Sequence, residues 1–501
     1  MEKSILQCLE DTANRLPNKT CFKDINREVT YKEFVQNAKK IGTGMFETEK
    51  INCPIGIFMD KAVSCLETMM GSLYSGNFYT ILDTKSPEER INLIIDTLNP
   101  IAIITDKKNL DKAEKLKFNG KIFVYEDLIQ RNINEERIKS IREKIIDTDP
   151  MYILFTSGST GVPKGTVISH KAVLAYATWV KDTFEITENT VFGSQTPFYF
   201  SMSVTDVFST ILTGATLIII PKMYFSFPVK LLEYLRENKI NTIYWVPSAL
   251  CIVANLGALE EISLPELKKV LFAGEVMPMK QLNMWREKLP ETLFANLYGP
   301  TETTDICTYY VVDRKFENTE TLPIGKHCDN CDVIIIKEDG TEAKRGEEGE
   351  LCVRGSFLAM GYYNNPEKTA SAFVQNPLNK CYPEIIYKTG DIVKENERGE
   401  IIYISRKDFQ IKHMGYRIEL GEIETAINAI EGIIACACVY DTTNSKIVLF
   451  YQGNKLEEKD LLEQAKSKLP TYMCPNEIHC LERMPYNANG KIDRKMLKSM
   501  I

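Results

Sequence analysis

The amino-acid sequence predicts an α/β protein: a large N-terminal domain of helix-covered sheets with a small β-barrel subdomain, followed by a small α+β domain. Three observations lead to this prediction. Residues 1–150 alternate amphipathic stretches with short apolar runs, as the helices and strands of a parallel sheet do. From about residue 323 the pattern changes to short strands and tight turns. Roughly the last 90 residues again mix helical and extended patterns in a compact unit.

Length and composition set the general class. A chain of 501 residues exceeds what one hydrophobic core usually serves, so at least two domains are expected. Hydrophobic residues make up 44% and charged residues 26%, which is ordinary for a globular chain with a large core. Lys and Arg total 61 against 68 Asp and Glu, a formal charge of −7 without a basic block. Nucleic acid is therefore not expected as a partner.

The cysteines and the N-terminal stretch indicate the compartment. Of the 14 cysteines, Cys328 and Cys331 form one CxxC, but no second pair follows at zinc-ribbon spacing, so a zinc site is not expected. Free thiols in this number favour a reducing environment. Residues 1–16 alternate charged and apolar residues and contain no signal-peptide core, and no apolar run reaches the length of a membrane span. A cytoplasmic protein is predicted.

The first 150 residues provide scaffold. A helix is expected from residue 32 to about residue 45, and a second, apolar enough to be buried, over residues 61–75. The apolar runs 55–59, 101–105 and 121–125 predict buried strands. No residue of this segment points to chemistry.

A loop of glycines and hydroxyl side chains, residues 156–165 (TSGSTGVPKG), follows the apolar run 151–155, which predicts a buried strand. Its glycines let the backbone curl and expose N–H groups, while Lys164 adds a positive charge, so the loop suits a polyphosphate and ATP is the expected ligand. It is not a Walker A loop, because Pro163 precedes Lys164 and no Ser or Thr follows the lysine directly. The expected phosphate contacts are Thr156, Ser157, Gly158, Ser159, Thr160 and Gly161.

As a ten-residue unit, this loop resembles the phosphate-binding signature of adenylate-forming enzymes, the superfamily of acyl-CoA ligases, luciferase-like enzymes and amino-acid adenylation domains. Four later stretches are similar to further signatures of the family, in the family's order: 298–303 (YGPTET), 387–391 (YKTGD), 405–412 (SRKDFQIK) and 485–494 (PYNANGKIDR). The resemblance covers essentially the whole chain. It is closest to stand-alone amino-acid-type adenylation domains and D-alanine carrier-protein ligases, and it implies ATP and Mg²⁺ as cofactors.

Three more apolar runs, 241–246, 270–273 and 293–297, predict buried strands whose carboxyl ends carry turns. Ligands of such sheets bind beyond those ends. The resemblance implies that the nucleotide is contacted there by Gly274, Glu275, Asn296 and Tyr298, that Thr301 contacts the α-phosphate and that Glu302 holds Mg²⁺. The chemistry agrees, because a carboxylate that attacks the α-phosphorus brings two anions together. One carboxylate plus phosphate oxygens is a ligand set that Mg²⁺ accepts.

The later signatures imply further roles. Asp391 would accept both ribose hydroxyls, Arg406 would contact ribose or phosphate, and Asp408 would be a hinge between residues 1–407, with the β-rich part at about 323–407, and a mobile domain, 408–501. Lys491 would bridge the substrate carboxylate and the α-phosphate, and a mobile domain could withdraw it afterwards. The implied catalytic residues are Lys164, Thr301, Glu302 and Lys491. Residues 415–424 resemble the segment that rotates inward to complete a pantetheine tunnel.

An aromatic stretch, residues 198–206, opens a helix that ends before Gly214. Such a cluster is ordinarily core, but in the resembled family it lines the substrate pocket. The positions that match the family's pocket describe a mostly apolar cavity with one phenol and a few hydroxyls, suited to a small or medium-sized acid. They are Phe200, Ser201, Met202, Thr205, Tyr244, Leu271, Ala273, Leu297, Asp305 and Ile306.

Ser201 departs from the family pattern. Amino-acid-activating members usually carry an aspartate at this position, which pairs with the substrate α-ammonium, and a buried ammonium without a carboxylate would cost several kcal/mol. Either the substrate lacks an α-amine, or its amine is bound elsewhere in the pocket, with Asp305 as the candidate. Alternatively, Asp305 is a solvated loop carboxylate or a helix cap.

The sequence thus predicts an ATP-dependent, AMP-forming ligase that activates an amino or aryl acid and transfers it to the phosphopantetheine thiol of a separate carrier protein. No carrier domain follows Lys491, so a stand-alone enzyme is expected. An acyl-CoA ligase is the alternative, although the tail form NGKID at 489–493 favours the carrier class and Ser201 argues against D-alanine. A silent nucleotide-binding protein would be expected to lack Lys164, Glu302, Asp391 or Lys491, and all four are present.

Overall fold

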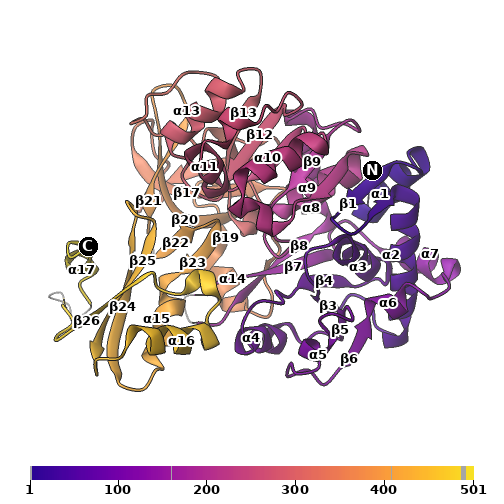
Figure 1. Cartoon of the computed structure of the whole chain (residues 1–501), viewed down its shortest axis with the longest axis horizontal. Helices are drawn as coiled ribbons and strands as arrows, with labels where there is room; N and C mark the ends of the chain where they lie inside the picture. Colours follow the sequence, from indigo (N-terminus) through magenta and orange to yellow (C-terminus); the bar gives the residue numbers. More distant parts are fainter. Residues whose placement is uncertain (1–2, 159–160, 408, 487–491) are drawn as a thin grey trace.

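A computed structural model describes residues 3–158, 161–407, 409–486 and 492–501, and it is built around two large sheets (Figure 1). The predicted α/β class is confirmed, because helices alternate with the strands of both sheets along the chain. Among the described residues, no helix combines the length and apolar character needed to cross a membrane.

The first sheet has seven strands and carries the predicted phosphate loop between two of them. In order across the sheet they are β18 (Gly361–Tyr362), β8 (Lys164–Ser169), β7 (Pro150–Thr156), β4 (Phe78–Ile81), β3 (Pro54–Phe58), β5 (Ala102–Thr105) and β6 (Lys121–Val124). The pairs from β7 to β6 are parallel, whereas β7–β8 and β8–β18 are antiparallel. The antiparallel turn of β7 into β8 therefore holds the loop at the end of β7.

The second sheet has nine strands and includes the N-terminal hairpin. In order they are β15 (Lys326–His327), β14 (Thr308–Val311), β13 (Leu293–Tyr298), β12 (Lys269–Ala273), β11 (Thr242–Trp245), β9 (Val191–Ser194), β10 (Thr216–Ile219), β1 (Thr20–Lys23) and β2 (Glu28–Thr30). The pairs from β13 to β1 are parallel. The first 150 residues therefore do not form one unit, because β1 pairs with β2 and β10 in the second sheet, whereas β3, β4, β5 and β6 belong to the first.

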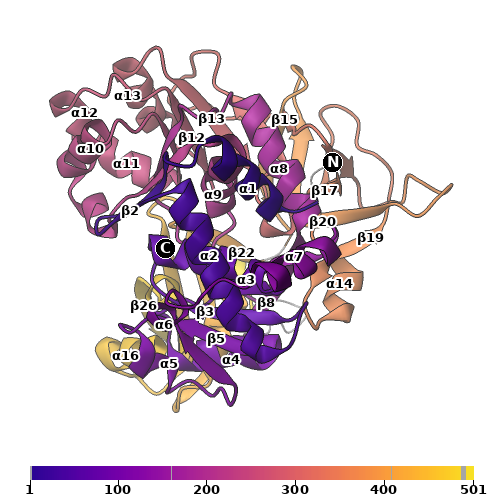
Figure 2. The same cartoon turned by 90° about the vertical axis from the view of Figure 1, so that its right-hand side faces the viewer.

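Helices join and cover the two sheets. In the N-terminal part they are α1 (Ile5–Arg15), α2 (Tyr31–Met45), α3 (Val63–Tyr74), α4 (Glu88–Leu98), α5 (Leu110–Ala113), α6 (Tyr125–Leu128) and α7 (Glu135–Lys144). With the second sheet come α8 (His170–Thr183), α9 (Ser203–Thr213), α10 (Pro228–Glu237), α11 (Pro247–Asn255), α12 (Ala258–Glu261) and α13 (Met279–Lys288). One continuous apolar core contains side chains from both sheets and from α1, α2, α3, α8 and α9. Figure 2 shows α1, α2 and α3 between the parts that contain the two sheets.

Local chemistry explains where helices begin. Thr30 accepts the N–H of Glu33 while the Glu33 carboxylate accepts the N–H of Thr30, a capping box that starts α2. The Ser169 hydroxyl accepts the N–H of Ala172 and starts α8. The helix that follows β8 is thereby fixed directly after the loop-bearing hairpin.

Residues 331–406 contain a third sheet, in the stretch where the sequence predicts a β-rich part. Five antiparallel strands are paired there: β16 (Cys331–Ile336), β17 (Glu348–Gly355), β19 (Phe373–Gln375), β20 (Ile385–Glu395) and β21 (Ile401–Arg406), with α14 (Pro366–Ala372) between two of them. β20 pairs with β17, β19 and β21. β18 leaves this part to pair with β8, which places Tyr362 beside the strand that begins at Lys164.

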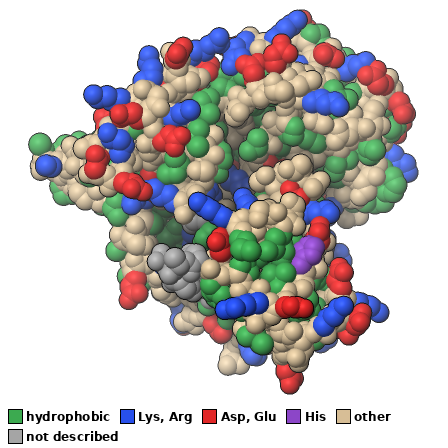
Figure 3. All heavy atoms as spheres, turned by 90° about the vertical axis from the view of Figure 1, so that its left-hand side faces the viewer, with side chains coloured by type: hydrophobic (Ala, Val, Ile, Leu, Met, Phe, Trp, Pro, Cys, Tyr) green, Lys and Arg blue, Asp and Glu red, His purple; other side chains and the backbone are tan. Residues whose placement is uncertain are grey.

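The C-terminal unit begins with a hairpin of β22 (Gln410–His413) and β23 (Tyr416–Glu419), whose turn needs positive φ at Met414 and Gly415. The remaining elements are β24 (Ile433–Asp441), β25 (Lys446–Gly453), β26 (Glu477–Leu481), α15 (Leu420–Asn428), α16 (Glu458–Lys468) and α17 (Arg494–Lys498). The unit has its own apolar core. The predicted boundary, Asp408, lies outside the described residues and stays a prediction. Figure 3 shows the molecular surface hollowed between this unit and the larger part, with Lys and Arg side chains in the hollow.

Candidate active site

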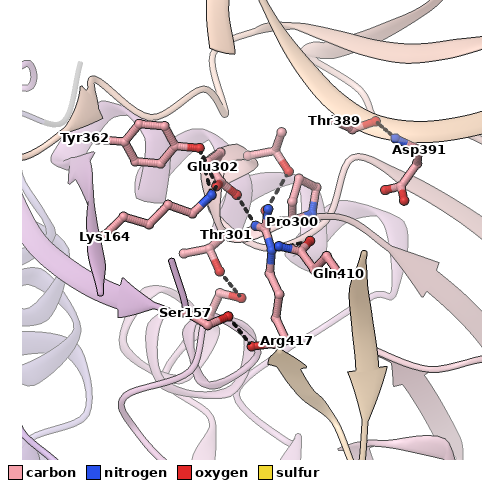
Figure 4. A network of polar contacts seen from close by, with 12 residues as sticks. Ser157, Lys164, Pro300, Thr301, Glu302, Tyr362, Thr389, Asp391, Gln410 and Arg417 are labelled. Atoms are coloured by element: carbon pink, nitrogen blue, oxygen red, sulfur yellow. Dashed lines mark hydrogen bonds and ion pairs between the residues drawn. The ribbon is translucent and has the colours of Figure 1, made fainter. Parts of the chain in front are cut away.

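Three parts of the fold meet around Glu302 (Figure 4). Glu302 lies in a turn of 3₁₀-helix, η3 (Thr301–Thr303), just past the carboxyl end of β13. Lys164 comes from the start of β8, Tyr362 from β18 and Arg417 from β23. The site is therefore built from both large sheets and from the C-terminal hairpin.

Glu302 is fully buried and holds two cations. Its Oε1 accepts a hydrogen bond from the Tyr362 hydroxyl at 2.7 Å and lies 3.3 Å from Lys164 Nζ, while its Oε2 accepts from Arg417 Nη1 at 2.6 Å. Burial by itself raises the pKa of Glu302, but the charges of Arg417 and Lys164 more than offset it and hold the pKa well below its usual value. Glu302 is thus an ionised carboxylate inside the protein.

Lys164 is also largely buried and contacts both Glu302 and Tyr362. Its Nζ lies 4.8 Å from the centre of the Tyr362 ring in addition to its contact with Glu302. Burial lowers the pKa of Lys164, the charge of Arg417 lowers it further, and Glu302 acts in the opposite direction. The sequence prediction that Lys164 and Glu302 act at one place is consistent with this contact.

The described part of the phosphate loop contacts the C-terminal unit. The Ser157 hydroxyl donates to the carbonyl oxygen of Arg417 at 2.8 Å and accepts the N–H of Glu419 at 3.1 Å. The N–H of Gly158 donates to Glu422 Oε2 at 3.2 Å, and the other oxygen of Glu422 pairs with Arg90. A carboxylate oxygen therefore stands at a loop N–H, where a phosphate oxygen would be bound by the same donor.

The remaining described residues of the phosphate loop do not contact the C-terminal unit through hydrogen bonds found in the structure. The Thr156 hydroxyl is buried without a hydrogen-bond partner among the described residues, so it is available to a ligand oxygen. Gly161 adopts a φ of +82°, which favours glycine. The predicted contacts Ser159 and Thr160, and the predicted catalytic Lys491, lie outside the described residues.

A second polar group surrounds Asp391. Its Oδ1 accepts from Arg406 Nη1 at 2.8 Å, and its Oδ2 accepts from the Tyr298 hydroxyl. Lys412 Nζ lies 4.9 Å from the centre of the Tyr298 ring, and burial lowers the pKa of Lys412 while Asp391 opposes that effect. Tyr298, Asp391 and Arg406, which the sequence assigns to the nucleotide, are therefore in contact. Asn296, on the same strand as Tyr298, donates to the carbonyl oxygen of Pro323 at 2.8 Å.

Glu275 contacts the C-terminal hairpin and not the residues around Asp391. Its Oε1 accepts the N–H of Gly415 at 3.0 Å, and its Oε2 accepts the N–H of Ser248 at 2.9 Å. Gly274 has a φ of +91°, and a side chain added there would approach Gly415. In this arrangement the turn after β12 positions the hairpin.

The predicted pocket residues converge on a buried carboxylate. Asp305 is 2% exposed, which excludes the solvated-loop interpretation. Its Oδ2 accepts hydroxyl hydrogen bonds from Tyr176 at 3.0 Å, Tyr244 at 3.0 Å and Thr205 at 3.1 Å. Burial raises the pKa of Asp305 to about 6, although these hydroxyls lower it. The other buried side chains of the predicted pocket are Met202, Leu271, Ala273, Leu297 and Ile306.

Two pocket residues connect this carboxylate to the rest of the site. Ser201 Oγ lies 3.5 Å from the hydroxyl of Thr301, the residue before Glu302. The Phe200 ring packs edge-on against Tyr416 of the hairpin, with ring centres 4.9 Å apart. Pocket, η3 and hairpin are therefore in direct contact.

Asp305→Asn is expected to stabilise the folded chain at neutral pH. The folded pKa of about 6 lies above the ordinary value of 3.8, so stability falls as the pH rises from about 4 to about 6 and the aspartate ionises. At pH 7.5 the ionised Asp305 therefore lowers the free energy of unfolding by about 3 kcal/mol, because each unit of pKa difference corresponds to about 1.4 kcal/mol. Urea unfolding of the variant and of wild type at pH 4 and pH 7.5 measures this difference. A gain in the free energy of unfolding of the variant that is the same at both pH values would contradict the prediction.

Sequence reasoning missed several residues of the site. Arg417, Glu422 and Lys412 lie in stretches that matched the family, yet no side-chain role was assigned to them. Their positive and negative charges on a short hairpin and the following helix were the available signal. Tyr362 and Tyr176 carried no signal, because each reaches the site through a pairing or packing distant in sequence.

Comparison with known proteins decides the family. Residues 9–363 match the model of the AMP-binding enzyme family, and residues 422–491 match that of the AMP-binding enzyme C-terminal domain. This chain belongs to the AMP-binding enzyme family. The resemblance inferred from the five signatures is thereby confirmed, and the family's adenylate-forming ligases use ATP.

This chain covers almost the whole length of some relatives in the family but less than half the length of another. The chain is 30% identical to Zwittermicin A synthase ZmaJ of Bacillus cereus, covering 99% of this chain and 95% of the relative, and 29% identical to the D-alanine--D-alanyl carrier protein ligase of Bacillus cereus (strain Q1), covering 99% of each. It is 31% identical to Tyrocidine synthase 1 of Brevibacillus parabrevis, but there it spans only 45% of the relative. The fold matches the Vibrio cholerae adenylation domain AlmE with a TM-score of 0.85 and 23% identity, covering 100% of this chain and 98% of AlmE.

The residues present fit ATP, and they fit a magnesium ion once Arg417 no longer contacts Glu302. The described residues include no group of three or more His, Cys, Asp or Glu side chains that could hold a metal ion by themselves. Glu302 is nevertheless an ionised carboxylate beside the phosphate loop, which suits an ion that takes its remaining ligands from phosphate and water. Because Arg417 contacts Oε2, the hairpin must move before both carboxylate oxygens are available.

Proposed function

We propose that this enzyme activates a carboxylic acid with ATP, forming an acyl-adenylate and pyrophosphate, and then transfers the acyl group to a thiol. One observation supports this most directly: the ionised Glu302 and Lys164 meet beside the Thr156–Gly158 loop. A site with buried opposite charges next to loop N–H and hydroxyl donors is suited to a polyphosphate.

The proposed roles follow from the contacts. Lys164 would hold phosphate oxygens, and Thr301 would position the α-phosphate from η3. Glu302 would hold Mg²⁺, which neutralises phosphate charge when bound. Asp391, in contact with Tyr298 and Arg406, would accept the ribose hydroxyls. Lys491 would stand between the substrate carboxylate and the α-phosphate.

We further propose that a phosphopantetheine thiol on a separate carrier protein is the acceptor. The full-length match to a D-alanyl carrier protein ligase and the NGKID tail support a carrier in preference to free CoA. The same proposal places a hinge at Asp408 between residues 1–407 and 408–501. The two acceptors are distinguished by single-turnover transfer from the adenylate to a holo carrier protein and to CoA, each at the same concentration.

Lys491→Ala is expected to reduce carboxylate-dependent ATP–pyrophosphate exchange by about 100-fold or more while leaving ATP binding within a few-fold. The positive charge of the lysine would stabilise the negative charge that develops on the α-phosphate in the transition state. Removing a group of this kind lowers the rate by at least about 100-fold. Exchange kinetics and equilibrium ATP binding measure the two effects. Parallel loss of ATP binding in a folded variant would contradict the assigned role.

A further inference from the structure

Asp305 is a buried carboxylate without a cation. The ion pairs found among the described residues do not include it, although Glu302, Asp391 and Glu422 in the same region each have one. Its donors are hydroxyl groups on one oxygen, from Tyr176, Tyr244 and Thr205. Hydroxyls satisfy hydrogen bonds but supply no charge, so the cost of burying the anion is only partly offset.

A second buried carboxylate lies behind the first. Asp206, on α9, is 1% exposed, and neither of its oxygens has a hydrogen-bond partner among the described residues. The nearby Lys61 Nζ instead donates to the carbonyl and hydroxyl oxygens of Ser194, at 3.0 Å each. Burial raises the pKa of Asp206, the charge of Lys61 acts in the opposite direction, and the charge of Asp305 raises the pKa further. A second buried acidic group therefore lies near Asp305.

The position of Asp305 relates it to the acid that is activated. The Ser201 hydroxyl lies 3.5 Å from Thr301, and its hydrogen bond to Asp305 is one of the contacts that lower the pKa of this carboxylate. Only one hydroxyl group therefore separates Asp305 from the residue proposed to position the α-phosphate. A substrate whose carboxylate lies near Thr301 extends from there toward Asp305.

We infer that the substrate is an amino acid whose ammonium group binds Asp305, an inference that rests on the proposed adenylation function. An ammonium supplies the charge that the three hydroxyls lack and brings its own donors. A hydroxy acid would add only another uncharged hydroxyl, and an acid with an apolar end would leave the carboxylate without a counter-charge. Ser201, beside Asp305, carries no charge, so the ammonium is bound by Asp305 alone.

Paired substrates test the inference on the wild-type enzyme. ATP–pyrophosphate exchange is measured for amino acids and for the same acids without the amine: glycine and acetate, D- and L-alanine, β-alanine and propionate, 4-aminobutyrate and butyrate, L-phenylalanine and 3-phenylpropionate. At least one amino acid is expected to exceed its partner about 100-fold in kcat/KM, as removing one member of a buried charged pair does. Equal kcat/KM within every pair would overturn the inference and leave the proposed function standing.

A variant and a matched control locate the effect. Asp305→Asn keeps the shape and removes the charge, so the preference for the amine should fall to below about 10-fold while the KM for ATP is unchanged. Glu67→Gln is the control, because Glu67 is also buried and accepts a tyrosine hydroxyl, that of Tyr125, away from the site. A full amine preference in Asp305→Asn would overturn the inference. Absence of exchange with every acid, in folded protein, would overturn the proposed function and this inference together.

Discussion

Glu302→Gln is expected to reduce carboxylate-dependent ATP–pyrophosphate exchange by about 1,000-fold, because the substitution removes charge from a preorganised site without removing volume. The amide can still contact the Tyr362 hydroxyl, but Lys164 would lose the carboxylate that offsets its charge. A divalent cation would also lose the carboxylate proposed to hold it. The effect on rate therefore has two sources that act in the same direction.

The Mg²⁺ dependence of exchange separates these sources. If Glu302 holds the metal, the variant will require a higher Mg²⁺ concentration for half-maximal exchange than wild type, in addition to its lower maximal rate. Glu67→Gln again serves as the control for replacing a buried carboxylate with an amide. An unchanged Mg²⁺ requirement, or exchange within 10-fold of wild type, would show that Glu302 is a structural counter-ion of Arg417.

Much of the fold followed from local sequence patterns. The apolar run 55–59 predicted a strand where β3 spans Pro54–Phe58, and the run 151–155 predicted a strand where β7 spans Pro150–Thr156. What could not be predicted are pairings between distant segments. β1 joins β10 across nearly 200 residues, and β18 crosses from the β-rich part to β8. Strand pairing depends on tertiary packing that neither strand's own residues specify.

The residues of the candidate site also divide into those that local sequence predicted and those that it did not. Residues at strand ends, such as Lys164 and Tyr298, were predicted because a recognisable turn carries them. The alternatives for Asp305 could not be separated by sequence, since a carboxylate in a loop is ordinarily solvated. Its burial and three hydroxyl contacts exclude the solvated-loop alternative. Arg417 and Glu422 were missed because their contacts depend on how the C-terminal unit docks on the rest of the chain.

Arg417→Ala is expected to affect the two half-reactions differently. In this structure Arg417 contacts Glu302 Oε2 and Glu422 contacts the loop N–H of Gly158, so a cation and an anion of the C-terminal unit occupy positions suited to a metal ion and a phosphate oxygen. If Glu302 holds Mg²⁺ as proposed, the docked hairpin and magnesium-bound ATP exclude each other at this carboxylate. This docked arrangement fits the step after pyrophosphate has left, when the acyl group is transferred.

The docked state loses one buried ion pair in Arg417→Ala, whereas the state that binds ATP does not use that pair. Transfer of the acyl group to the thiol should slow by roughly 10- to 100-fold, because truncating one partner of a buried pair costs several kcal/mol and Lys164 remains to offset part of it. ATP–pyrophosphate exchange should stay within a few-fold of wild type, and its half-maximal Mg²⁺ concentration should fall because the competing guanidinium is gone.

Single-turnover transfer from preformed adenylate, measured beside exchange, gives the two rates separately, and Arg417→Lys should recover part of the transfer rate because it restores a charge without the guanidinium geometry. Contacts at the other end of the hairpin, between Gly415 and Glu275, are unchanged by either substitution, so the hairpin retains an anchor. Equal slowing of exchange and transfer would mean that Arg417 serves the adenylation step itself. Competition between the hairpin and Mg²⁺ for Glu302 would then not explain how the enzyme alternates between adenylation and acyl transfer.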